Sequence, residues 1–131
     1  MIVVDTSAWI EFLRDTGSPT CNAVDDLLGG DIAICDAISM EILAGARDEL
    51  HLLQLRKLLA RATVLRTTSA SYDHAAALYR TCRRQGETVR KLIDCLIAAV
   101  VIESGASLLH ADVDFGTLAR HTQLRIQDSD S

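Results

Sequence analysis

The chain has 131 residues, of which 49% are hydrophobic and 24% are charged, an ordinary composition for a globular protein. No apolar stretch approaches the roughly 18 residues that a membrane-spanning helix needs, and the N-terminus lacks the basic start of a signal peptide. We therefore expect one domain over residues 1–131, in the cytoplasm and without a membrane anchor. Thirteen basic and eighteen acidic residues give a net charge of −5, an unusual balance for a protein that approaches a nucleic acid.

Strands and helices are predicted to alternate along the chain. Strands are expected at residues 2–5, 32–35, 63–65 and 107–109, with a further edge strand at 124–126. Helices are expected between them: from a Ser7 cap to Arg14, from Pro19 to the Gly29–Gly30 pair, after an Asp36 cap, around 50–59, from Ser69 or Ser71 to Gln85, over 91–103 and over 115–121. This alternation predicts an α/β fold class with a mostly parallel sheet covered by helices on both faces.

Two acids follow predicted strands. Asp5 ends the first strand, and Asp112 comes just after the strand at 107–109. In open parallel sheets, ligands bind beyond the carboxyl ends of the strands. The sequence therefore predicts that these two carboxylates share one edge of the sheet.

Asp94 is the most informative residue of the sequence. It lies in LIDCLIAAVVI, residues 92–102, where every other position is apolar, so its helix is predicted to be buried. An unpaired buried charge costs at least several kcal/mol, so the carboxylate must be paired, protonated or bound to a cation. An ion pair with Lys91 or a distant arginine is one alternative, and we favour a metal ligand.

Each remaining acid also has an ordinary explanation when it is considered alone. Glu41 can favour a helix dipole, Asp5 can cap a helix, and Asp112 and Asp114 suit a turn. Their joint placement predicts four or five converging carboxylates, which would repel one another without cations. Oxygen ligands of this kind suit one or two Mg²⁺ or Mn²⁺ ions, and no Cys/His cluster suggests zinc. The cysteines are expected to be reduced thiols in or near the core: Cys21, Cys35, Cys82 and Cys95.

Four segments together resemble a known family. VVDTSAWIEFL, SMEILAGAR, RKLIDCLIAAV and LLHADVDF are similar, in order and spacing, to the PIN-domain nucleases, especially the toxins of VapBC-type toxin–antitoxin modules. The resemblance implies a three-layer α/β/α sandwich and a Mg²⁺- or Mn²⁺-dependent endoribonuclease that hydrolyses RNA with a metal-activated water. It also implies a homodimer and a cognate antitoxin protein.

The resemblance also assigns residues by position. Its catalytic, metal-binding quartet corresponds to Asp5, Glu41, Asp94 and Asp112, and Asp114 matches a frequent fifth acid that contacts the metal directly or through water. Thr6 matches a hydroxyl residue that orients the first aspartate. His110 departs from the family pattern, which usually has threonine or serine there; an imidazole is able to donate a hydrogen bond instead.

Basic and aromatic residues allow two interpretations each. Arg83, Arg84, Arg90 and Lys91 follow the long predicted helix, where they either compensate its dipole or form a phosphate track for RNA. Trp9 and Phe12 are expected to pack in the core rather than to stack on bases. Two other functions are weighed against a nuclease: a catalytically silent PIN-type module that binds RNA or protein, and a metal-dependent phosphatase.

Overall fold

A sheet of four parallel strands forms the centre of the computed structural model, which describes residues 1–129. The strands are β1 (Ile2–Val4), β2 (Ile32–Cys35), β3 (Thr63–Leu65) and β4 (Ser107–Leu109), in the spatial order β3-β2-β1-β4. All four agree with the predicted ranges to within one residue. The chain therefore builds β1, β2 and β3 outward in one direction and then returns to add β4 on the other side of β1.

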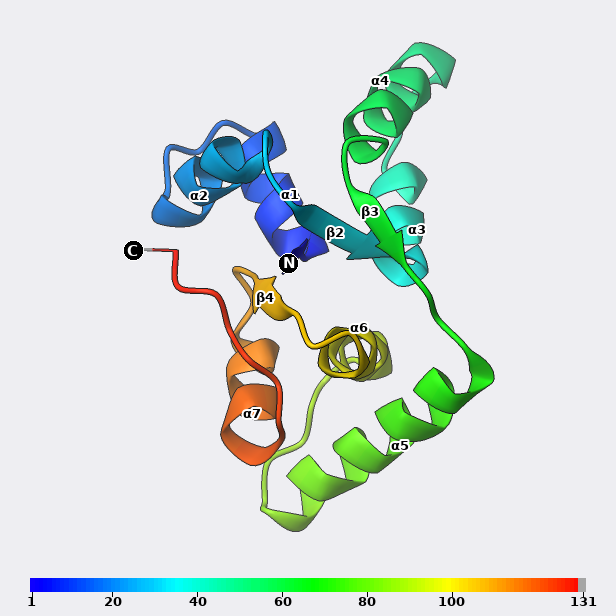
Figure 1. Cartoon of the computed structure of the whole chain (residues 1–131), viewed down its shortest axis with the longest axis vertical. Helices are drawn as coiled ribbons and strands as arrows, with labels where there is room; N and C mark the ends of the chain where they lie inside the picture. The colour runs from blue at the N-terminus through cyan, green and yellow to red at the C-terminus, as the bar shows by residue number, and fades with distance from the viewer. Residues whose placement is uncertain (130–131) are drawn as a thin grey trace.

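Seven helices of the described chain surround this sheet. They are α1 (Thr6–Leu13), α2 (Pro19–Leu27), α3 (Asp36–Ala44), α4 (Glu49–Leu59), α5 (Ser69–Arg84), α6 (Leu92–Glu103) and α7 (Val113–His121). In Figure 1, α1 and α2 lie on one side of the strands, and α5, α6 and α7 lie on the other. This arrangement confirms the predicted α/β fold with helices on both faces of a parallel sheet.

Three helices begin earlier than predicted. Asp5, rather than Ser7, caps α1, and its side chain accepts a hydrogen bond from the Ser7 backbone N–H. Asp112 caps α7 in the same way, so this helix starts at Val113, and α3 starts after Cys35. An N-cap oxygen reaches the backbone N–H two or three residues ahead, and Ser and Asp are equally suited to this role. As a result, two candidate site acids also fix the start of a helix.

The predicted edge strand at 124–126 is shortened to a single parallel bridge between Leu108 and Ile126. Two backbone hydrogen bonds hold it, from Leu108 N to Arg125 O at 2.9 Å and from Gln127 N to Leu108 O at 2.8 Å. The segment thus runs beside β4 as expected but is too short to count as a strand.

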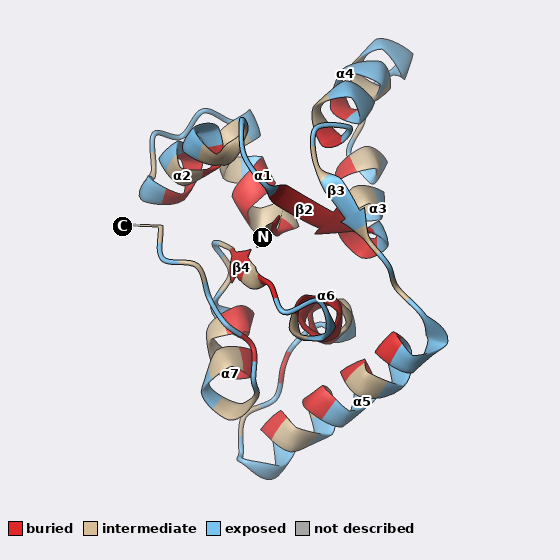
Figure 2. Cartoon of the chain, in the orientation of Figure 1, coloured by how far each residue is buried: buried red, intermediate tan, exposed pale blue. Residues whose placement is uncertain are grey.

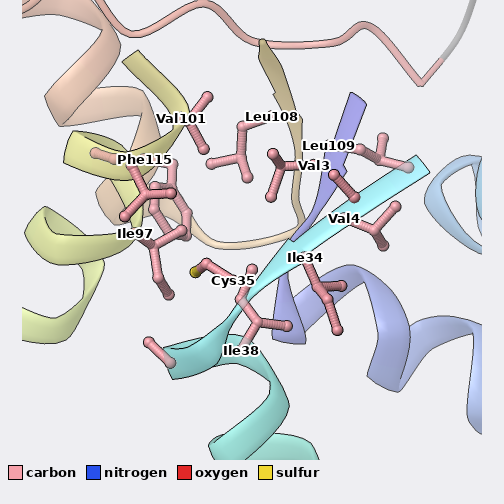
Figure 3. Packing of buried hydrophobic residues seen from close by; sticks show 14 of the residues in the cluster. Val3, Val4, Ile34, Cys35, Ile38, Ile97, Val101, Leu108, Leu109 and Phe115 are labelled. Atoms are coloured by element: carbon pink, nitrogen blue, oxygen red, sulfur yellow. The ribbon is translucent and has the colours of Figure 1, made fainter. Parts of the chain in front are cut away.

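The core lies between the sheet and the helices on both of its faces. Figure 2 shows that β2 and α6 are buried along most of their length. Figure 3 shows Val3, Ile97, Leu108 and Phe115 on one side of the strands and Ile34 on the other. The apolar helix predicted around Asp94 is therefore confirmed as a central core element.

The remaining expectations about the interior also agree with the structure. Trp9 is fully buried, and Phe12, half-buried, meets it edge to face with ring centroids 6.4 Å apart, so both pack in the core as predicted. The four cysteines are free and buried. No helix of the described residues is both long enough and apolar enough to cross a lipid bilayer.

Candidate metal centre

The sheet topology brings Asp5 and Asp112 to the same edge. β1 and β4 are neighbouring parallel strands, and the Asp5 backbone N–H continues their pairing by donating to Leu109 O at 3.0 Å. Strand order reverses between β1 and β4, and such a switch point opens a crevice beyond the carboxyl ends of the strands. The first turn of α6 carries Asp94 to this edge, since the charges of Asp5 and Asp112 both act on its carboxylate.

Asp94 is buried without a hydrogen-bond partner for one of its oxygens. Its side chain lies in the first turn of α6, and Oδ2 is shielded from solvent and accepts no hydrogen bond within the described chain. Burial is the main reason that the pKa of Asp94 rises from 3.8 to about 7; Asp112 and Asp5 add to the rise, and Lys91 opposes it. The alternative of an ion pair with Lys91 or an arginine therefore leaves Oδ2 of this carboxylate without a partner among the described residues.

Asp94, Asp112 and Asp114 form a compact carboxylate group. One oxygen from each lies within 4.8 Å of the other two. Asp112 Oδ1 also accepts the Asp114 backbone N–H at 3.0 Å, which ties the two α7 acids together. The structure therefore brings three of the five predicted acids within the reach of one small cation.

Asp5 and Glu41 lie outside that three-acid group. Asp5 is buried, and burial raises its pKa, although hydrogen bonds from Ser7 and Thr6 act in the opposite direction and the Asp112 charge adds to the rise. Glu41 comes from α3 and is half-buried. Its charge is one of three, with Asp94 and Asp112, that raise the pKa of Lys91, so it faces the same basic side chain as the cluster.

The Thr6 hydroxyl serves a different acid from the one predicted. Thr6 Oγ1 donates to Glu41 Oε1 at 2.7 Å, whereas the hydroxyl that binds Asp5 belongs to Ser7, at 2.6 Å from Oδ2. Ser7 Oγ also accepts the Ala111 backbone N–H at 2.9 Å and so joins the first helix to the loop after β4. Sequence reasoning missed this role because it gave Ser7 the helix cap, which Asp5 provides.

His110 accepts a hydrogen bond where a donated one was expected. Its Nδ1 receives the Asp112 backbone N–H at 3.1 Å, and its ring packs against Phe115 with centroids 5.3 Å apart. Burial lowers the pKa of His110, against the opposing effect of Asp112, and this favours a neutral ring. The imidazole therefore shapes the turn that carries Asp112 rather than donating to an acid through Nδ1.

The four predicted RNA-binding residues fall into two groups. Arg90 Nε lies 3.2 Å from both oxygens of Asp114, and Lys91 Nζ lies 3.5 Å from Asp112 Oδ2, so these two cations are directed at the site acids. Arg83 and Arg84 lie in the last turn of α5. Arg83 stacks over the Tyr79 ring, which suits compensation of the helix dipole as well as contact with a phosphate.

This donor set fits a hard divalent cation. All candidate ligand atoms are carboxylate oxygens, the type that Mg²⁺ and Mn²⁺ prefer. Asp94 Oδ2 is a buried acceptor without a partner, which is costly unless a cation or a proton occupies it. Arg90 and Lys91 neutralise Asp114 and Asp112 but leave this oxygen unsatisfied. A divalent cation held by this cluster would therefore satisfy Asp94 Oδ2.

The fold and the site together define a small α/β domain with a cluster of carboxylates at the switch point of its parallel sheet. The PIN domain profile matches residues 2–121, and the chain belongs to the PIN-domain family.

Individual relatives agree with this assignment. Ribonuclease VapC11 of Mycobacterium tuberculosis is 45% identical over 129 residues, which cover 95% of this chain and 96% of that protein. Ribonuclease VapC51 of the same organism is 29% identical over 93 residues, or 71% of this chain and 68% of that protein.

Solved structures share the fold at low identity. VapBC2 from Rickettsia felis, solved with a promoter DNA fragment, has a TM-score of 0.78 and 19% identity and covers 97% of this chain and 98% of its own. VapBC-1 from nontypeable Haemophilus influenzae has a TM-score of 0.78 and 22% identity, with full coverage of both chains.

Proposed function

We propose that this chain is a metal-dependent endoribonuclease and the toxin of a toxin–antitoxin pair. The observation that carries the metal-dependent chemistry is the partnerless Asp94 Oδ2 within the group of three carboxylates. Support for the substrate comes from the relative that is 45% identical and is named a ribonuclease. An electroneutral or histidine-based site would not need so many acids at one edge.

The proposed ligands are Asp5, Glu41, Asp94 and Asp112, with Asp114 as a fifth acid that acts on the metal directly or through water. A bound Mg²⁺ or Mn²⁺ ion would lower the pKa of an attacking water and neutralise charge that develops on the phosphate. Ser7 fixes the Asp5 carboxylate and the loop of Ala111, and Thr6 fixes Glu41. These hydroxyls hold the acids in place against their mutual repulsion.

Arg90 is proposed to affect both the acids and the RNA at this site. Arg90 binds both oxygens of Asp114. Because these oxygens are already engaged, we expect Asp114 to act on the metal through water rather than as a direct ligand. A cation close to the scissile phosphate would also favour the approach of RNA to an acidic edge.

The test is cleavage of total cellular RNA by the purified protein with Mn²⁺, with Mg²⁺ and with EDTA. Asp94→Asn should abolish cleavage, because the neutral amide removes a ligand charge while keeping the size of the side chain. Asp73→Asn on the exposed surface of α5 is the matched control and should cleave like the wild type. Equal activity in Asp94→Asn would contradict the assignment.

The same experiment separates the two alternative functions. Metal binding by calorimetry without cleavage of any RNA would identify a silent binding module. Release of phosphate from a small phosphomonoester, with RNA left intact, would identify a phosphatase.

The partners are proposed on the same basis. Two solved structures with this fold are described as VapBC bound to DNA, and another is described as a toxin–antitoxin complex. These descriptions support an antitoxin partner for this chain. A homodimer and a cytoplasmic location belong to the same proposal; the four free cysteines fit a reducing compartment. Light scattering of the purified chain tests the dimer directly.

A further inference from the structure

A pocket lies beside the acidic edge of the sheet. It encloses about 510 Å³ between α1, α3 and α4, a volume typical of small-ligand sites. Thr6 and Glu41, which are joined by a hydrogen bond of 2.7 Å, line its wall and also belong to the acidic edge. We call this space the α1–α4 pocket, defined by Thr6, Ile10, Arg14, Glu41, Arg47 and His51.

Two unpaired arginines line the α1–α4 pocket. Arg14 follows the end of α1, Arg47 precedes α4, and both are exposed. Neither guanidinium has a hydrogen bond or an ion pair with any residue in the described range 1–129. Arg90 and Arg120, in contrast, are engaged with Asp114 and Glu87. Arg14 and Arg47 are therefore free to bind an anion beside the site.

His51 adds a donor to the same wall. Its Nδ1 accepts the Arg47 backbone N–H at 3.1 Å, so in the neutral ring the proton is on Nε2. The hydrogen bond also fixes the turn that presents Arg47.

Apolar residues also line the α1–α4 pocket. Ile10 and Leu13 on α1 are exposed large hydrophobic residues, and Leu55 of α4 closes the pocket from the buried side. The flat face of a nucleobase is suited to such an apolar surface. A phosphate is suited to an arginine, whose guanidinium binds it through two parallel hydrogen bonds.

We propose that the α1–α4 pocket binds the stretch of single-stranded RNA next to the scissile phosphate, with backbone phosphates on Arg14 and Arg47 and a base against Ile10 and Leu13. This inference rests on the proposed function. It assigns RNA binding to residues outside the basic group at 83–91 that the sequence indicated. A chain of net charge −5 needs unpaired cations near its acidic centre to hold a polyanion there, and these two arginines supply them.

The test measures binding of a short, unstructured, fluorescently labelled RNA by anisotropy. All proteins carry Asp94→Asn, so that the RNA is not cut. Adding Arg14→Ala and Arg47→Ala should weaken binding about tenfold and make the dependence of log Kd on log salt shallower by about 1.4, because two phosphate contacts to a single strand are lost. Arg56→Ala with Arg80→Ala is the charge-matched control, since both side chains are exposed and lie outside the pocket.

Each outcome decides the inference. Unchanged affinity and salt dependence in the Arg14/Arg47 variant, or an equal loss in the Arg56/Arg80 control, would overturn it and leave a protein segment as the occupant of the pocket. Cleavage by proteins with intact Asp94 is measured in parallel. Metal-dependent cleavage with unchanged RNA binding would reject only the pocket, whereas arginine-dependent binding without cleavage would support the pocket and reject the proposed nuclease.

Discussion

At the scale of single residues, the charged form of the Asp94 carboxyl is unfavourable in the metal-free protein. Its side chain is 3% exposed, and its pKa is about 7 in the folded chain against 3.8 for an ordinary aspartate. The folded state therefore binds this proton more tightly than the unfolded state does. The stability that protonation provides is fully present below about pH 3.8 and is lost as the pH rises through about 7.

Asp94→Asn should consequently stabilise the metal-free protein, and more so at high pH. The gain in the free energy of unfolding should grow from about pH 5 to about pH 8 and reach on the order of 2–4 kcal/mol. Urea unfolding in EDTA at both pH values measures it, with the exposed Asp73→Asn as control. A gain that is the same at both pH values would show that the carboxylate is not desolvated.

Arg90 and Lys91 place positive charge beside Asp112 and Asp114 of the acidic cluster. Because Arg90 binds Asp114 and approaches Asp112, a metal ion must compete with it for negative charge. Arg90→Gln should bind Mn²⁺ roughly fivefold more tightly, corresponding to about 1 kcal/mol of relieved repulsion.

Calorimetric titration with Mn²⁺ provides the measurement. Arg120→Gln removes an equal charge from the Glu87 ion pair, outside the acidic cluster, and should leave the affinity unchanged. Weaker Mn²⁺ binding by Arg90→Gln would mean that the arginine organises the ligands rather than competing with the ion.

At the scale of helices and strands, two polar side chains of α5, Ser71 and His74, bind Glu103 at the end of α6. Ser71 Oγ donates to Glu103 Oε1 at 2.7 Å and accepts the Thr68 backbone N–H at 3.1 Å, which completes a capping box at the start of α5. His74 Nδ1 holds the other Glu103 oxygen at 2.9 Å. The long helix is thereby fixed to the helix that carries Asp94.

Ser71→Ala should therefore destabilise the fold by about 1–3 kcal/mol, since it leaves buried polar partners unsatisfied and removes a cap. Ser69→Ala, at an exposed position of the same first turn, should change stability far less. Chemical denaturation of the two variants provides the comparison. A similar change in both variants would show that the buried hydrogen bonds of Ser71 do not contribute to stability.

The sequence was sufficient for most elements because each carries a local signal. The apolar run around Asp94 predicted a buried helix, and short runs of mostly apolar residues predicted all four strands. Helix starts were less predictable, because Asp5 and Ser7 are equally good caps and Ser7 instead binds Ala111, which is distant in sequence. Arg90 and Lys91 were ambiguous for a related reason: the direction of a long side chain depends on acids distant in sequence.

At the scale of the whole molecule, the order β3-β2-β1-β4 gathers into one edge acids from both ends of the chain. Asp5 comes from the first strand, Glu41 from the helix after β2, and Asp94 and Asp112 from the helix before β4 and the loop after it. The fold therefore concentrates negative charge at one place, where Arg90 and Lys91 partly balance it.

The bond between Ser7 and Ala111 spans 104 positions of the chain. A ribosome releases the N-terminal residues first, so the strand and helix that hold Asp5 emerge long before the loop that contains Ala111 and Asp112. During that interval a nascent chain carries the first acid of the centre without its partners. A polypeptide interrupted before β4 would thus lack Asp112 and Asp114, and the acidic cluster is assembled only after β4 and the loop that follows it have emerged.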